Sequence, residues 1–142
     1  MKKSIIISLL ALIGIMPIFA EVNQMTTAQF KDRIYDYSSS AEWKFKGKKP
    51  VIIDFYTTWC GPCKRLAPIM EELSEKYKGR VVFYKVDIEK EPELAAKFQI
   101  SSIPQVLYIP MKGKPQKLVG LYPKDQIEEI ITQFLLPAAK KK

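Results

Sequence analysis

The only two cysteines of the chain lie in one tetrapeptide, Cys60-Gly61-Pro62-Cys63, directly after Trp59. Two thiols at this spacing on the first turn of a helix are close enough to form a disulfide, so the pair can alternate between oxidised and reduced forms. The pattern therefore predicts dithiol–disulfide exchange, in which a thiolate attacks a disulfide and a second thiol completes the reaction.

Composition excludes most other uses of a Cys-x-x-Cys pair. Zinc usually takes four ligands, and the chain has no histidine and no second cysteine pair. Haem attachment needs His directly after the second cysteine, where Lys64 stands, and an iron–sulfur cluster needs more thiols. We therefore expect no metal and no cofactor. A static structural disulfide stays open as an alternative.

The N-terminus has the pattern of a secretory signal peptide, residues 1–20. Lys2 and Lys3 precede an apolar stretch, Ile5–Phe19, and Ala20 offers a small residue for cleavage. An uncleaved membrane anchor is the alternative, but the stretch is shorter than the roughly 20 residues that span a bilayer comfortably. We expect export to the periplasm or another extracytoplasmic compartment, without stable membrane insertion after cleavage.

The remainder, residues 21–142, is predicted to form one domain with a frayed basic tail at 138–142. A chain of this length buries about two-thirds of its unfolded surface, so it needs no disulfide in order to fold. This favours a functional use of the cysteines over a structural one.

The predicted mature chain carries a moderate positive charge. Of 23 basic residues, Lys2 and Lys3 belong to the signal, which leaves 23 − 2 = 21 against 15 acidic residues, or +6. The excess is scattered, and we expect no nucleic-acid partner. Two lysine-rich runs, Lys44–Lys49 and Lys140–Lys142, are interpreted as a solvated loop and a frayed tail, with acidic surfaces or membrane headgroups as alternative contacts.

Hydrophobic periodicity predicts strands that alternate with helices. A capping box at Thr26 predicts a first helix over 27–37, and a polar loop then leads to a strand at 51–56 that is apolar on both faces. The next helix starts at the cysteine motif, is expected to kink at Pro68 and ends near Gly79.

The second half of the sequence predicts a strand, a short helix, a hairpin and a closing helix. The strand covers 81–86, the short helix 92–98, and the two hairpin strands 105–109 and 116–120. The closing helix has five apolar residues on one face: Ile127, Ile130, Ile131, Phe134 and Leu135. This order predicts an α/β fold with a mixed sheet covered on both sides.

The stretch Val51–Leu136 resembles thioredoxin. The residues that carry the resemblance, in chain order, are Asp54, Trp59-Cys60-Gly61-Pro62-Cys63, Pro68, Lys85, Ile103-Pro104 and Gly120. The resemblance implies the thioredoxin fold, with a sheet of about five strands flanked by four helices, and protein-disulfide reductase activity. Together with the signal segment, the chain looks most like an exported thioredoxin of a bacterial envelope.

Position along the helix assigns different roles to the two cysteines. Cys60 lies at the helix start, where free N–H groups and the helix dipole lower the pKa of a thiol, so it is the predicted nucleophile. Cys63, one turn further, is the predicted resolving cysteine. Asp54 lies in an apolar strand, where a carboxylate without a partner is expensive to bury; an Asp that reaches solvent at the strand end is the alternative. The resemblance implies that Asp54 exchanges a proton with Cys63 and that Lys85 tunes Asp54.

The resemblance also implies a surface for extended substrates. The Ile103–Pro104 bond is expected to be cis and to face the dithiol, where its backbone pairs with the substrate. The remaining members of this apolar rim are Trp59, Gly61, Pro62 and Gly120, although Trp59 taken alone is also compatible with an ordinary core position.

Several residues depart from the common family pattern. They are Tyr56, Thr58 and the Ser101-Ser102 pair before Ile103. They border the reactive surface, so they bear on the choice of partner and not on the chemistry. We expect a monomeric reductase of disulfides in exported proteins that receives electrons from a membrane donor. The alternatives are a disulfide oxidase or isomerase, and a non-catalytic binding module with the same fold.

Overall fold

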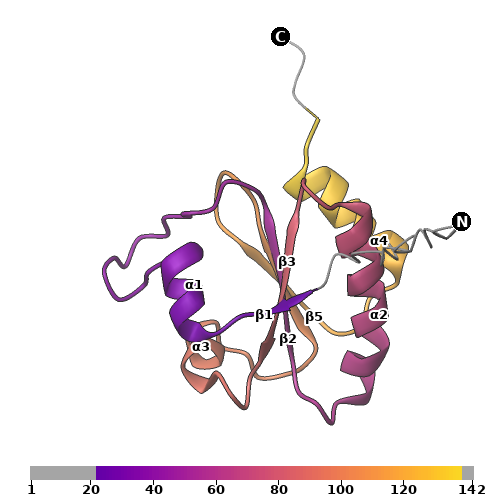
Figure 1. Ribbon diagram of the computed structural model, residues 1–142, viewed down its shortest axis with the longest axis horizontal. Coiled ribbons are helices and arrows are strands. Elements are labelled where there is room, and N and C mark those ends of the chain that lie inside the picture. The colour runs from indigo at the N-terminus through magenta and orange to yellow at the C-terminus, as the bar shows by residue number, and fades with distance from the viewer. Residues whose placement is uncertain (1–21, 139–142) are drawn as a thin grey trace, which may run out of the picture.

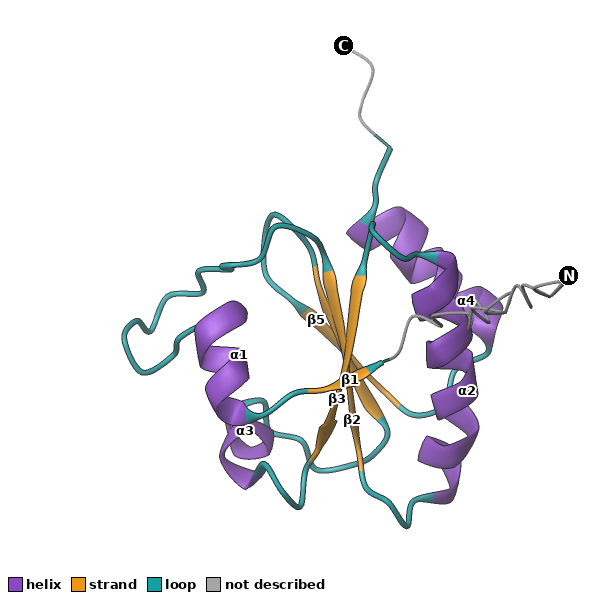
Figure 2. Ribbon diagram, in the orientation of Figure 1, coloured by secondary structure: helices purple, strands orange, loops and turns teal. Residues whose placement is uncertain are grey.

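The computed structural model describes residues 22–138, so the predicted signal segment lies outside the described part of the chain. The elements follow in the order β1 (Asn23–Gln24), α1 (Thr27–Arg33), β2 (Val51–Tyr56), α2 (Gly61–Lys76), β3 (Val82–Asp87), α3 (Pro92–Lys97), β4 (Gln105–Ile109), β5 (Gln116–Val119) and α4 (Lys124–Ile130). The sheet forms the middle layer, with α1 and α3 on one face and α2 and α4 on the other (Figures 1 and 2). The five strands and four helices are those that the thioredoxin resemblance implies.

The sheet is mixed, with strand order β1-β3-β2-β4-β5. β3 is parallel to both β1 and β2, whereas β4 is antiparallel to β2 and to β5. β2 therefore lies at the centre, and its residues are buried except at Tyr56, which explains why the sequence there is apolar on both faces. The hairpin between β4 and β5 was expected from the sequence and is present.

Alternate residues of β2 contribute to two separate cores. Ile52 packs with Leu66 and Leu73 of α2. Ile53 and Phe55 instead belong to the core that includes Phe30 of α1. Because side chains alternate along a strand, Asp54 shares the face of Ile52, which is the face that α2 covers. This alternation places Asp54 beneath α2, the helix that carries Cys63.

The first helix is shorter than the prediction of 27–37, because α1 ends at Arg33. The capping box at Thr26 is present, so the predicted start is confirmed. Beyond Arg33 local bonds compete with the helix. The Tyr35 hydroxyl donates to the carbonyl of Ser40, and the Asp36 carboxylate accepts from the N–H of Ser38.

The boundaries of the remaining helices and strands differ from the predicted ones by small amounts. β1 was not predicted, because two polar residues have no detectable period, and β3 begins at Val82 instead of residue 81. α2 continues through Pro68 without interruption. The closing helix changes to a π-helical segment, Ile131–Leu135, where the Thr132 hydroxyl donates to carbonyls of the preceding turn and competes with their helical bonds.

Candidate active site

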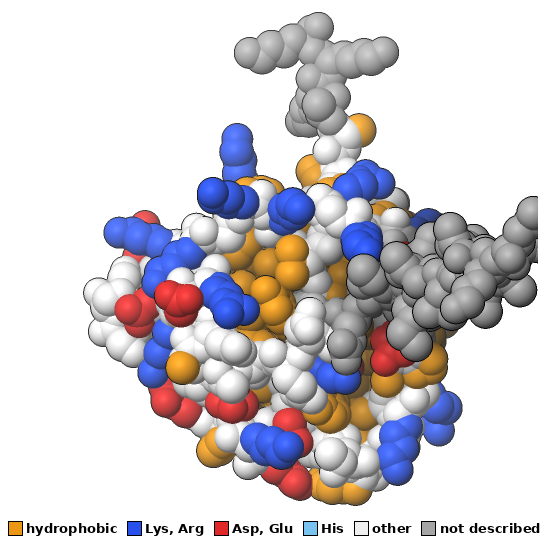
Figure 3. Space-filling view, viewed as in Figure 1, with side chains coloured by type: hydrophobic (Ala, Val, Ile, Leu, Met, Phe, Trp, Pro, Cys, Tyr) orange, Lys and Arg blue, Asp and Glu red, His pale blue; other side chains and the backbone are white. Residues whose placement is uncertain are grey.

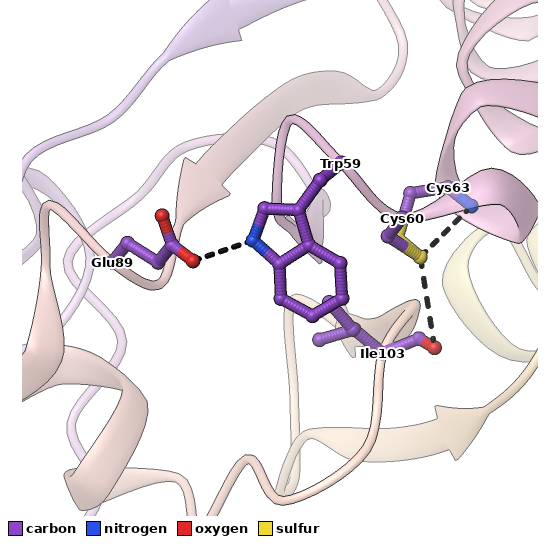
Figure 4. Close-up of a disulfide and its surroundings, with 5 residues drawn as sticks. All are labelled: Trp59, Cys60, Cys63, Glu89 and Ile103. Atoms are coloured by element: carbon purple, nitrogen blue, oxygen red, sulfur yellow. Dashed lines mark hydrogen bonds between the residues drawn. A yellow bond between two sulfur atoms is a disulfide. The ribbon is translucent and has the colours of Figure 1, made fainter.

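The two cysteines form a disulfide at the start of α2. Their Cα atoms are 5.2 Å apart. Cys60 is the N-cap residue, with extended backbone, and its sulfur accepts a hydrogen bond of 3.3 Å from the N–H of Cys63 (Figure 4). Pro62 lies in the first turn, where the missing N–H of proline costs no helical bond. The helix N-terminus is thus built around the Cys60 sulfur, which favours its thiolate.

Exposure does not separate the two cysteines in the disulfide form. Cys60 is 5% exposed and Cys63 is 3% exposed. Exposed area therefore does not distinguish the predicted nucleophile from the predicted resolving cysteine, and the difference between them lies in the helix position. The Cys60 sulfur also lies 3.9 Å from the carbonyl oxygen of Ile103. Because a disulfide sulfur carries no proton, this approach is a contact in the oxidised form and becomes a donor–acceptor pair only in the dithiol.

Asp54 is a buried carboxyl group without a compensating hydrogen bond. Its residue is 5% exposed, and its Oδ1 atom is buried with no partner. Burial raises its pKa from 3.8 to about 7, while the charge of Lys85 acts in the opposite direction. Near neutral pH this carboxyl group is therefore present in both protonation states, which is the condition for accepting and returning a proton.

Lys85 is the cationic neighbour of Asp54. The two residues lie opposite each other in the parallel pairing of β2 with β3, and Val106 of β4 flanks Asp54 on the other side. Lys85 is half-buried, so water screens the interaction between its charge and the Asp54 carboxyl group only in part. The strand register brings together the two residues that the sequence separates by 31 positions.

The loop before β4 lies against the dithiol and against β5. The Ile103–Pro104 peptide bond is cis. The carbonyl oxygen of Pro104 accepts a hydrogen bond of 2.8 Å from the N–H of Gly120. Gly120 has φ +106°, a conformation that L side chains rarely adopt, so glycine is needed there. This bond joins the half-buried Gly120 to the buried Pro104, which directly follows Ile103, the residue whose carbonyl oxygen contacts the Cys60 sulfur.

Trp59 forms the most exposed apolar part of this surface. Its side chain is 67% exposed, and its indole N–H donates to the Glu89 carboxylate over 2.6 Å (Figure 4). A core position for Trp59 is therefore wrong. Gly61 adds to the open surface, because a Cβ atom there would meet nothing within 4 Å. The predicted rim residues thus lie around the disulfide, and Trp59 is held by a partner that the sequence analysis did not identify.

Three polar residues near the site were missed. Glu89 follows β3 by two positions, and the carboxyl ends of the parallel strands β2 and β3 meet at one edge of the sheet, a rule that could have indicated it. Thr57 and Gln105 are buried, and each has a side-chain oxygen without a partner. No sequence signal distinguishes these two from ordinary strand-end residues.

Within residues 22–138, His, Cys, Asp and Glu form no group of three or more that could hold a metal ion. In the same residues, no helix is both long and apolar enough to cross a membrane. The groups at the site that can exchange electrons and protons are the Cys60–Cys63 pair and the carboxyl group of Asp54. A disulfide at a helix N-terminus, backed by a buried carboxyl group of raised pKa, defines a thiol–disulfide oxidoreductase.

Comparisons with known proteins agree with this class. The family model described as Thioredoxin matches residues 21–133. A thioredoxin of Borreliella burgdorferi is 46% identical over 110 residues, which cover 78% of this chain and 94% of that protein. The chloroplastic M-type thioredoxin of Spinacia oleracea is 35% identical over 100 residues, which cover 70% of this chain and 55% of that protein. The chain belongs to the thioredoxin family.

A solved structure supports the same assignment. The crystal structure of chloroplastic thioredoxin z has a TM-score of 0.67 and 30% sequence identity, and the match covers 80% of this chain and 93% of that one. The thioredoxin fold implied by the motifs is thus confirmed by the topology of the sheet and by the match to a solved relative.

Proposed function

We propose that this protein is a protein-disulfide reductase that acts on exported proteins. The observation that carries the proposal is the arrangement of the disulfide at the start of α2 above a buried, unpartnered Asp54 with a pKa of about 7. A purely structural disulfide needs neither a helix N-terminus beneath its sulfur nor an ionisable group behind it. A non-catalytic binding module has no need of them either.

The first half of the reaction uses Cys60. Its thiolate attacks one sulfur of the substrate disulfide, the substrate S–S bond breaks, and one substrate thiolate leaves while a mixed disulfide forms. The N–H of Cys63 and the helix dipole stabilise the attacking thiolate. The apolar rim and the backbone at Ile103 receive the extended substrate segment next to the sulfur.

The second half uses Cys63. Its thiol gives its proton to the Asp54 carboxylate and attacks the Cys60 sulfur of the mixed disulfide, which releases the second substrate thiolate and forms the Cys60–Cys63 bond. Two electrons have then passed from the dithiol to the substrate. A dithiol donor must return them, and we propose a membrane protein as that donor. We also propose that the protein works as a monomer outside the cytoplasm.

Cysteine variants test the proposal. The wild type should reduce a disulfide-containing protein such as insulin with dithiothreitol as the electron source, and Cys60→Ser should abolish turnover. Cys63→Ser should stop after one step and leave a mixed disulfide on Cys60, detectable as a covalent adduct. Equal turnover by Cys60→Ser and wild type would overturn the proposed order of attack.

The Cys63→Ser variant, which holds substrates as mixed disulfides, also tests the proposal that the substrates are exported proteins. Full-length Cys63→Ser, expressed in a bacterial host, should capture exported proteins as adducts that reducing agent releases. Cys60→Ser is the matched control, because it keeps the fold and lacks the predicted nucleophile. Adducts made up only of cytoplasmic proteins would contradict exported substrates while leaving the reductase chemistry intact.

A further inference from the structure

Three turns meet at the end of the sheet opposite the dithiol. They are residues 44–50 before β2, residues 77–81 before β3, and residues 110–115 between β4 and β5. Val51 is paired with Val82 on one side and with Ile109 on the other, so the three turns leave neighbouring strands at the same level. They form one continuous end surface, to which the lysine-rich loop noted in the sequence contributes.

This end surface carries exposed cations and no acidic residue. Its sequences, 44–50, 77–81 and 110–115, contain no Asp or Glu. Figure 3 shows Lys and Arg side chains gathered along the upper edge of the molecule, away from the lower end where α2 begins in Figure 1. We call the exposed cationic residues of this end surface the six-cation face; they are Lys48, Lys49, Lys78, Arg80, Lys112 and Lys114.

Among residues 22–138, the members of the six-cation face have no acidic partner. The ion pairs among the described residues use other lysines, namely Lys31, Lys44, Lys76 and Lys124. Arg80 lies 5.8 Å from the ring of Tyr77, and this is a contact with an aromatic ring and not with an anion. Lys90, by contrast, stands between two acidic residues in the sequence, Glu89 and Glu91.

Apolar groups lie among these charges. Met111 is 45% exposed in the turn between β4 and β5. A groove of about 230 Å³ at the turn before β2 combines cations with an apolar lining. The groove is lined by Arg33, Ile34, Gly47, Lys48, Lys49, Val51, Val82 and Tyr84. Cations that surround small apolar groups are suited to the boundary between headgroups and acyl chains.

We propose that the six-cation face docks the protein on a membrane surface that contains anionic phospholipids. Five of its six cations are lysines, which act as point charges on diffuse anionic surfaces, whereas recognition of individual phosphates favours the fork of arginine. The charges are spread over three turns of one end surface, as contact with a plane requires. Met111 is the side chain that enters the interface.

Docking in this way orients the active site. β2 runs from the end surface at Val51 towards the dithiol that follows Tyr56, and a strand of this length spans roughly 20 Å. The dithiol then faces away from the lipid, towards proteins in the surrounding solution. A membrane donor that reduces it must extend beyond the headgroup layer. This proposal depends on the proposed export in one respect only, which is that the chain must meet a membrane surface that contains anionic phospholipids.

The test compares binding to vesicles by two triple variants of the full chain. One variant changes the six-cation face (Lys48→Gln, Lys112→Gln, Lys114→Gln). The matched control removes the same charge elsewhere (Lys64→Gln, Lys90→Gln, Lys97→Gln). All six positions are exposed, and residues 1–21 are the same in every protein, so the apolar N-terminus contributes equally. Flotation is measured at about 0.1 M salt with vesicles of phosphatidylcholine alone or with one-third phosphatidylglycerol.

The wild type should bind the anionic vesicles at least tenfold more tightly than the neutral ones. Each cation near an anionic leaflet contributes roughly a fivefold gain, so the first variant should lose at least tenfold in binding and the control less than threefold. Equal losses in the two variants would show an effect of net charge alone and overturn the proposal. Displacement from vesicles by soluble polyglutamate at equal charge would indicate an acidic protein partner and also overturn it.

Reductase turnover of the same variants separates this proposal from the proposed function. The six-cation-face variant should reduce a soluble disulfide protein at the wild-type rate, since that face is remote from the dithiol. Lost vesicle binding with normal turnover is the expected pattern.

Discussion

Replacement of Asp54 by Asn should stabilise the protein, and the gain should depend on pH. The folded-state pKa of about 7 lies above the ordinary value of 3.8. As pH rises above about 4, the unfolded chain loses this proton first, so the folded state is progressively disfavoured until Asp54 itself ionises near pH 7. Below pH 4 both states are neutral, and the penalty is absent.

The magnitude follows from the difference between the two pKa values. Each pKa unit corresponds to about 1.4 kcal/mol, so a buried ionised Asp54 lowers the free energy of unfolding by about 4 kcal/mol at pH 8. Asn has the same shape and carries no charge. Asp54→Asn should therefore raise the free energy of unfolding by about 4 kcal/mol at pH 8, by about 3 kcal/mol at pH 6 and by less than about 1 kcal/mol at pH 4.

Guanidinium unfolding of the oxidised protein at these three pH values measures the effect. Asp32→Asn is the matched control, because Asp32 is exposed on α1 and the same substitution there should change stability little. A gain at Asp54 that is the same at pH 4 and pH 8 would refute the assignment of a buried carboxyl group with a raised pKa.

Three further predictions concern the neighbours of the site and the core. Lys85→Gln removes the charge that lowers the pKa of Asp54, so the carboxyl carbon signal of Asp54 in NMR should titrate at higher pH than in the wild type; an unchanged titration would mean that the two residues are uncoupled. Glu89→Gln weakens the hydrogen bond from Trp59, so KM for a protein disulfide should rise while the unfolding midpoint stays the same; a change in kcat alone would contradict a role in substrate binding. Phe30→Ala removes a fully buried ring that meets Phe98 edge-on and should lower the free energy of unfolding in urea by about 3–5 kcal/mol, with a loss below about 1 kcal/mol as the contrary result.

Much of the fold could be predicted from the sequence, because its signals are local or strongly periodic. The strand at 51–56 is a continuous apolar run, and its predicted bounds match β2. The capping box at Thr26 marks the start of α1. The end of α1 could not be predicted, since it depends on the bond from the Tyr35 hydroxyl to Ser40, and apolar periodicity continues past it. β1 exists only because β3 offers it an edge.

The candidate active site likewise combines residues that could be predicted from the sequence with contacts that could not. The cysteine spacing and the carboxylate in an apolar strand were visible as local patterns, and the family resemblance indicated Lys85, Pro104 and Gly120. The contact between Trp59 and Glu89 joins segments 30 residues apart and depends on where β3 ends. It therefore required the sheet register, which no local pattern contains.

The reduction potential of the Cys60–Cys63 pair tests the central claim most directly. The wild type is equilibrated with mixtures of reduced and oxidised glutathione, or with a thioredoxin of known potential, and the dithiol fraction is measured by alkylation and mass spectrometry. Thioredoxins have a reference potential of about −270 mV, and strong disulfide oxidases about −120 mV. A reductase requires a value near the first. A value near the second would contradict the proposed direction of electron flow.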